Sequence, residues 1–372
     1  IETPMYVHAI CRYAQWSNKK TWLRAHWPVV QKGIQWLRTM REQSPVGTSY
    51  AGLMPPGFID GGISTKHSDY GATLWAMVAI EKGIAAARWL GESKDEKDWK
   101  VLFDQFMGSF KTAARRDLRR DESGNPYLPV IVGDTALEVP QRGQFAILLP
   151  LCFSSIFQSH DSLLDSIIHF NLAMLDATTK EGLISNSGWM KDGLWPWLGG
   201  IHGMAHHLAG NNQKAIDLLY AVANHAAPTG VWVEEQQQKK DGNNTSGDAS
   251  NAEASAIFIH FVRNLLVREK PDTLEFLSGV PDEWIHRGAV IEVNNGLTEF
   301  GPVTMKLQIS GDGKRGDLRI SGIDGHGKKG YPVVVLSALK RAGFTAANGT
   351  PLPDRLVGSW KKAMSLSVIS TK

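Results

Sequence analysis

The sequence has few of the features that would assign it to a class at once. Its only cysteines, Cys11 and Cys152, lie far apart in apolar runs, so we expect buried thiols and no disulfide framework. There is no run of about 18 uncharged apolar residues, which argues against a membrane span. The first residues, IETPMYVHAI, lack the basic and then apolar pattern of a signal peptide, so we expect that any export signal has been removed.

An excess of charge of one sign is also missing. Forty basic and 37 acidic side chains give a net charge of +3, which is too small to predict a nucleic-acid partner or an anionic membrane surface. No phosphate loop, dinucleotide fingerprint or nucleophile elbow is present, so we expect no cofactor. With 372 residues, 42% of them hydrophobic, the chain can build one large domain and a smaller one.

Helical periodicity dominates the chain up to residue 268, and the helices recur in pairs. The segment 68–90 is apolar nearly all round, which is typical of a helix buried between layers. The expected helices span residues 3–16, 19–42, 68–90, 95–119, 141–158, 160–178, 197–209, 211–226 and 250–268.

Short alternating apolar segments follow the helices, among them AVIEVNN, TMKLQIS and DLRISG, and turn signals divide them. Helices first and strands second predict a mainly α fold, an α/α toroid followed by a small antiparallel β domain. We place the helical α/α-barrel domain at 1–270 and the β-sheet domain at 271–372. In such a ring the loops at one end form the pocket, so conspicuous loops are expected to carry function.

The first such loop is GFIDGGISTKHSDY, which contains Asp60, Lys66, His67 and Asp69. Glycines flank Asp60 and allow backbone or a ligand to approach its carboxyl group closely. Such an environment suits a carboxyl group whose pKa is raised so that it can donate a proton. The alternative is an ordinary turn aspartate. Asp69 is expected to cap the helix that follows.

Tryptophans and carboxylates mark two further loops. In SNSGWMKDGLWPWLGG, at least one of Trp189, Trp195 and Trp197 is expected to line the pocket, with core packing as the alternative for each ring. In GVWVEEQQ, alternation along an extended stretch points Glu234 and Glu235 in different directions, although both could simply begin a polar loop. Two separated carboxyl groups are what hydrolysis of a glycosidic bond requires.

The segment HGMAHH offers a metal-binding alternative. His202 and His206 could share a helix face, but no third ligand accompanies them at a recognised spacing. A helix-end histidine pair is therefore favoured, and no metal is expected.

The chain resembles the six-hairpin glycosidases, the (α/α)6-barrel glycoside hydrolases that include glucoamylases, trehalases and α-L-rhamnosidases. The segment VWVEEQQQ…SGDASNAEASAIFIHFVRNLLV is similar to the glucoamylase-like stretch in which the catalytic base lies in a Glu-Gln pair, and LEFLSGVPDEWIHRGAVIEVNNG resembles the small β domain of bacterial members. The resemblance implies that Glu235 is the general base and, by location, that Asp60 is the general acid.

We therefore expect a glycosidase that acts on an oligo- or polysaccharide, with inversion if the two carboxyl groups lie about 6.5–9.5 Å apart. A polysaccharide lyase acting on uronates and a non-catalytic carbohydrate-binding subunit stay open as alternatives. We favour a periplasmic or secreted location over the cytoplasm. The candidate substrate contacts are Lys66, His67, Asp69, Trp189, Asp192, Trp195, Trp197, Trp232, Glu234 and Gln236.

A full ring of this family has twelve helices, and about nine are readable here. We therefore expect a toroid that is incomplete at its N-terminus, with a fragment, a processed product and a ring completed by another polypeptide as the alternatives. Because a truncated ring exposes an apolar flank, we also expect a second copy or a partner chain to complete it.

Overall fold

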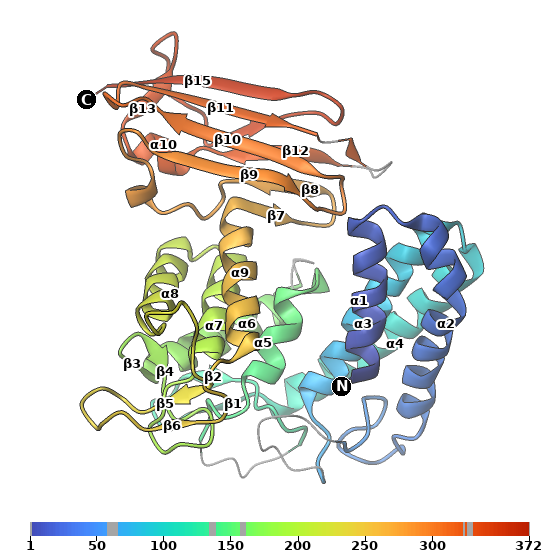
Figure 1. Ribbon diagram of the computed structural model, residues 1–372. Coiled ribbons are helices and arrows are strands. Elements are labelled where there is room, and N and C mark those ends of the chain that lie inside the picture. Colours follow the sequence, from blue (N-terminus) through green and yellow to red (C-terminus); the bar gives the residue numbers. More distant parts are fainter. Residues whose placement is uncertain are drawn as a thin grey trace. The chain divides into compact units, whose positions relative to one another are not determined.

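The chain forms two compact units, described here from a computed structural model (Figure 1). The first unit comprises Ile1–Arg12 and Lys20–Phe261, and the second comprises Tyr13–Lys19 and Val262–Lys372. The division expected at residue 270 stays a prediction. Within the described ranges, no helix is both long enough and apolar enough to cross a membrane. The structure describes residues 2–57, 66–133, 139–156, 161–322, 324–325 and 330–371.

Helices build the first unit, as predicted. α3, α5 and α7 are buried nearly all round, whereas α2, α4 and α8 bury one face. α3 packs on α4 and α7 packs on α8, which confirms the expected pairing for these four helices. The helices are α1 (Glu2–Trp16), α2 (Lys20–Glu42), α3 (Tyr70–Leu90), α4 (Ser93–Asp117), α5 (Phe145–Cys152), α6 (Ser162–Ala177), α7 (Pro196–Leu208), α8 (Asn212–Asn224) and α9 (Ala252–Leu266).

Phe153, directly after α5, is a common contact of several helices. Its ring centroid lies 5.9 Å from that of His8 on α1, 6.1 Å from Trp75 on α3 and 4.9 Å from His260 on α9. The first and the last helix of the unit therefore meet at one residue, as expected for helices arranged around a centre. Cys11 and Cys152 are both buried and no disulfide joins them, as predicted.

The N-terminal ends of the buried helices lie at the same end of the unit as three two-stranded ribbons (Figure 1). Leu194, just before α7, pairs with Gln236 in one ribbon, and Asp69, just before α3, pairs with Ile131. Helix N-termini carry partial positive charge, so this end of the unit favours carboxylates. The ribbons are β1 (Arg119–Arg120) with β2 (Pro126–Tyr127), β3 (Thr179–Lys180) with β4 (Leu183–Ile184), and β5 (Glu235–Gln236) with β6 (Thr245–Ser246).

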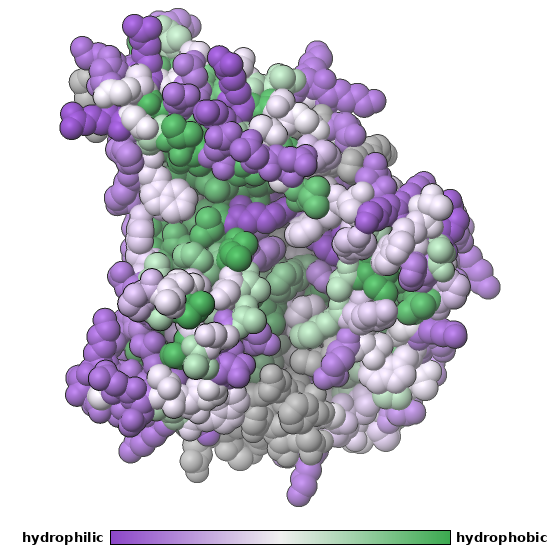
Figure 2. Space-filling view, viewed as in Figure 1, coloured by the Kyte–Doolittle hydropathy of each residue, from purple (hydrophilic) through white to green (hydrophobic). Residues whose placement is uncertain are grey.

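The turn between β5 and β6 is strongly polar. It contains the sequence QKKDGNN, and Figure 2 shows hydrophilic residues at the lower left, where this hairpin lies. The Glu234 side chain holds the hairpin together, because its Oε2 accepts the backbone N–H of Asp248 at 3.0 Å. The polar stretch therefore forms the turn of a β-hairpin.

The second unit contains two sheets, which confirms the predicted β module. One is antiparallel, in the order β13-β15-β11-β10-β9; the other has the order β14-β12-β8-β7, and there β8 and β12 run parallel. The elements are β7 (Val267–Glu269), β8 (Thr273–Phe276), the 3-10 helix Asp282–Trp284, β9 (Val290–Gly296), β10 (Val303–Ile309), β11 (Arg315–Ser321), β12 (Tyr331–Val335), α10 (Ser337–Arg341), β13 (Phe344–Ala346), β14 (Arg355–Val357) and β15 (Met364–Ser370).

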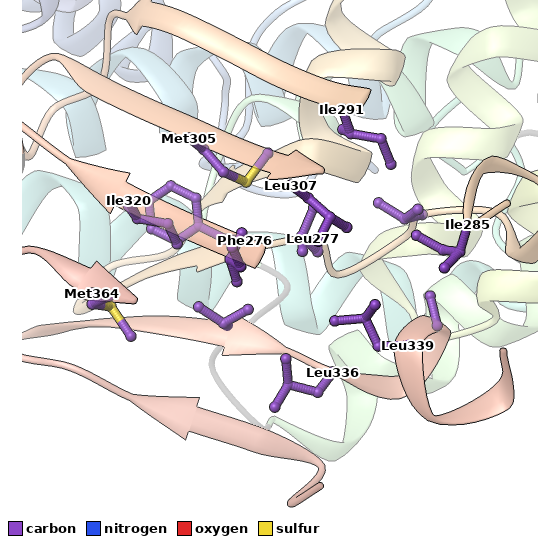
Figure 3. Packing of buried hydrophobic residues seen from close by; sticks show 14 of the residues in the cluster. Phe276, Leu277, Ile285, Ile291, Met305, Leu307, Ile320, Leu336, Leu339 and Met364 are labelled. Atoms are coloured by element: carbon purple, nitrogen blue, oxygen red, sulfur yellow. The ribbon is translucent and has the colours of Figure 1, made fainter. Parts of the chain in front are cut away.

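Alternating side chains form the core of this unit. On β10 and β11 buried and more exposed residues alternate, and Met305 faces Ile320 across the ladder as Leu307 faces Leu318. Figure 3 shows Met305, Leu307 and Ile320 in one cluster with Phe276, and Leu318 belongs to the same cluster. The two-residue repeat in the sequence therefore correctly predicts which side chains point into the core.

Candidate active site around Glu235

The Glu235 carboxylate lies at the ribbon end of the helical unit. Glu235 is fully buried on β5. Its Oε2 accepts the backbone N–H groups of Trp189 and Met190, each at 2.9 Å. Its Oε1 is buried and has no hydrogen-bond partner among the described residues. One oxygen is therefore held in place, and the other keeps its lone pairs.

Burial and hydrogen bonding act on this carboxylate in opposite directions. Desolvation raises the pKa of Glu235 above its ordinary value, and the N–H groups of Met190 and Trp189 offset part of the rise. The nearby negative charge of Glu234 adds to the rise. A glutamate in this setting takes up a proton closer to neutral pH than an exposed one does.

Two glycines let the 188–193 turn close around the carboxylate. A Cβ added to Gly188 would lie 2.7 Å from Glu235 Oε1, and one added to Gly193 would lie 2.6 Å from it. The backbone at Asp192 has a φ of 56°, in the left-handed region that aspartate tolerates better than most residues. The turn needs small or permissive residues at these positions because the carboxylate occupies the space.

Aromatic rings continue from this turn into the core. Trp189 is 49% exposed, and its ring centroid lies 5.2 Å from that of the buried Trp195. Trp195 in turn lies 4.9 Å from Trp197, which is also buried. Trp189 is thus the ring of the three that meets solvent, and the other two support it.

The neighbours of Glu235 along the chain have other partners. Glu234 points to Asp248, so the two glutamates face different directions, as alternation predicts. Gln236 is paired through its backbone with Leu194. Trp232 is 5% exposed and donates its indole N–H to the Val222 carbonyl at 2.7 Å. Its ring serves the core, so we leave Trp232 out of the proposed sugar-binding set.

The first predicted loop is only partly described. Asp60 lies outside the described residues, so its distance from Glu235 stays a prediction. Lys66 and His67 are exposed. Asp69 caps α3, as expected: its Oδ1 accepts the Ala72 N–H at 2.5 Å.

Sequence reasoning missed the groups that hold Glu235. The Trp189 and Met190 amides belong to SGWMKDG, in which two glycines bracket a short turn. That spacing was the available signal for a turn that wraps around another group. Nearly every residue type has a backbone amide, so the sequence does not indicate which amides bind Glu235.

The fold is similar to that of an α-L-rhamnosidase from Dictyoglumus thermophilum, with a TM-score of 0.50 and 12% identity. The match covers 94% of this chain and 38% of that one. The chain therefore shares the fold of an α/α-toroid glycosidase. It spans well under half the length of that enzyme, and the similarity concerns the fold alone.

Two further structures match more weakly. An α-L-rhamnosidase from Streptomyces avermitilis has a TM-score of 0.46 and 14% identity, over 94% of this chain and 30% of that one. A metal-independent α-mannosidase from Streptococcus pneumoniae has a TM-score of 0.43 and 14% identity, over 64% of this chain and 61% of that one. No protein-family model and no curated protein matches the sequence.

Proposed function

We propose that the protein is a glycoside hydrolase in which Glu235 is the general base and Asp60 the general acid. The observation that carries the proposal is the Glu235 carboxylate, held through Oε2 by two amides while Oε1 makes no hydrogen bond among the described residues. A general base must be fixed in position and keep a lone pair for the proton of water. The raised pKa brings this group closer to neutral pH, where such a base works best.

The surroundings of Glu235 support a sugar as substrate. Trp189 offers an exposed ring for stacking, and Asp192 in the same turn is an exposed polar group for hydroxyl contacts. Lys66 and His67, which follow Asp60 along the chain, are also exposed, and we propose that they bind hydroxyl groups of the same sugar. Because the similar fold belongs to an α-L-rhamnosidase, an aryl α-L-rhamnoside is the first substrate to test. Aryl glycosides of other sugars and plant or microbial oligosaccharides follow.

The test compares the wild type with Glu235→Gln and Asp60→Asn on the aryl glycosides. We expect each variant to lose about 10²–10⁴-fold in turnover, because each loses one proton transfer. Glu235→Gln keeps an oxygen that can accept the Trp189 and Met190 amides, so it should melt near the wild-type temperature. Glu122→Gln, an exposed residue between β1 and β2, is the matched control and should keep full activity.

The same contacts would let Glu235 serve only as an anchor for the 188–193 turn. In that case Glu235→Gln would keep its turnover, or would lose stability and activity together. Either result would argue against Glu235 as the general base. Sugar binding without turnover in the wild type would instead favour the carbohydrate-binding alternative.

A further inference from the structure

A second cluster of titratable side chains lies where α6 and α7 meet. His202 and His206 stand one helical turn apart on α7, and Asp176 is near the end of α6. Asp176 Oδ1 lies 3.1 Å from His202 Nε2 and 3.2 Å from His206 Nε2. The two Nε2 atoms are 3.1 Å apart. Three atoms that can bind a metal therefore form a nearly equilateral triangle.

We propose that Asp176, His202 and His206 bind a divalent transition-metal ion of the zinc type. In tetrahedral zinc sites with bonds of 2.0–2.1 Å, neighbouring ligand atoms lie about 3.3 Å apart. The edges of this triangle, 3.1–3.2 Å, fit one face of such a tetrahedron. Two imidazoles and one carboxylate suit zinc chemically, and the fourth position is left for water.

The packing of the helices explains why these atoms converge. Residues four apart lie on one face of a helix, so both imidazoles point the same way. His202 and His206 are buried, and the Asp176 side chain is 32% exposed, which leaves the carboxylate side as the entry for an ion. The sequence shows only the histidine pair, and α6 supplies the third ligand.

The next shell of residues fits the proposal at His206, whereas His202 Nδ1 is buried and has no hydrogen-bond partner among the described residues. Asn211 Nδ2 lies 3.3 Å from His206 Nδ1. Amide oxygen and nitrogen positions are interchangeable assignments, so the Asn211 oxygen can accept the Nδ1–H and hold Nε2 toward the ion. The Lys214 ammonium, 3.5 Å from Asp176 Oδ1, competes for the same carboxylate. Its side chain is 38% exposed and can turn to solvent when the ion binds.

The site is remote from Glu235 along the chain and along α7. His206 lies about 15 Å from Pro196, the first residue of the helix, measured along its axis. The N-terminal end of α7 is the end joined to β5 through Leu194. We therefore assign the ion a structural role, as a clip between α6 and α7 that stabilises the folded state by binding to it alone.

The test uses tag-free wild-type protein freed of metal with a chelator. Calorimetric titration with Zn²⁺ should give one ion per chain, and zinc should raise the melting temperature. Co²⁺ at the same site should give the strong visible absorption of four-coordinate cobalt. Asp176→Asn and His206→Gln should weaken zinc binding by about 100-fold or more and abolish the shift in melting temperature.

His169→Gln, an exposed histidine on α6, is the matched control and should bind zinc as the wild type does. Absence of stoichiometric zinc binding by the wild type would overturn the proposal without any variant. Equal affinity in Asp176→Asn, His206→Gln and the wild type would also overturn it. A network held only by hydrogen bonds would give no cobalt spectrum.

Discussion

At the scale of single residues, Glu235 depends on the small size of its neighbours. Because a Cβ at Gly193 would lie 2.6 Å from Oε1, Gly193→Ala should displace the carboxylate. A misplacement of about 1 Å can cost about 10²-fold in rate, so we expect a fall of that order in kcat/KM on whichever glycoside is turned over.

The matched control for Gly193→Ala is Gly108→Ala. Gly108 lies within α4, and a Cβ there would meet nothing within 4 Å. This change should leave activity unaltered and raise the free energy of unfolding by up to about 1 kcal/mol. Full activity in Gly193→Ala would show that the position of Oε1 does not matter for turnover.

Asp69 should make the stability of the protein depend on pH. Burial raises the pKa of this carboxyl to about 7, whereas the unfolded chain releases the proton near pH 4. Between these values the folded state binds more protons, so the Asp69 contribution to stability is lost as pH rises toward and above 7. Asp69→Asn keeps the cap of α3 without titrating.

Denaturant unfolding at pH 5 and pH 8 measures this effect. From pH 5 to pH 8, the free energy of unfolding of the wild type should fall relative to that of Asp69→Asn, by up to about 3 kcal/mol. If the free energy of unfolding changed equally with pH in the wild type and in Asp69→Asn, Asp69 would have an ordinary pKa.

At the scale of elements, a buried ion cluster joins strands of the second unit. Glu275 on β8 is 2% exposed and lies 2.9 Å from Arg268 on β7 and 3.0 Å from Lys270. It also accepts a hydrogen bond from Arg355 on β14. Burial acts to raise the pKa of Glu275, but the surrounding cations outweigh it and lower the pKa.

Glu275→Gln should therefore destabilise the protein by about 3–5 kcal/mol, because it leaves the buried Arg268 without its counter-charge. Glu292→Gln is the control: Glu292 pairs with Lys306 at 3.8 Å in a partly exposed bridge, and its loss should cost under about 1 kcal/mol. Thermal unfolding of the two variants compares them directly. Equal losses would contradict a special role for the cluster.

Element boundaries show where local pattern stops being informative. The predicted helices for the most part agree with α1 to α9, because apolar periodicity is a local property. The helix expected over 141–158 is the exception, since α5 spans only Phe145–Cys152. Turn hydrogen bonds occupy the preceding residues, and Pro150 lies close to the end of the helix. The ribbons β1 to β4 and β6 have no apolar alternation and the sequence does not predict them, whereas β5 falls in the extended stretch expected at GVWVEEQQ.

At the scale of the whole molecule, the proposed chemistry joins two remote segments. Asp60 and Glu235 are far apart in sequence, and inversion requires them about 6.5–9.5 Å apart with water between. We expect proton NMR of the first turnover products to show the anomer opposite to that of the substrate. Release of the same anomer would indicate retention and a separation near 5 Å.

The sequence by itself determined the mainly α fold, the β module that follows it and the opposite directions of Glu234 and Glu235. These features follow from local repeats of 3.6 and two residues. Only the tertiary structure decided which remote groups meet: the Met190 and Trp189 amides with Glu235, and Asp176 with the histidines of α7. Such contacts depend on how helices and turns pack in three dimensions, so a local repeat in the sequence does not predict them.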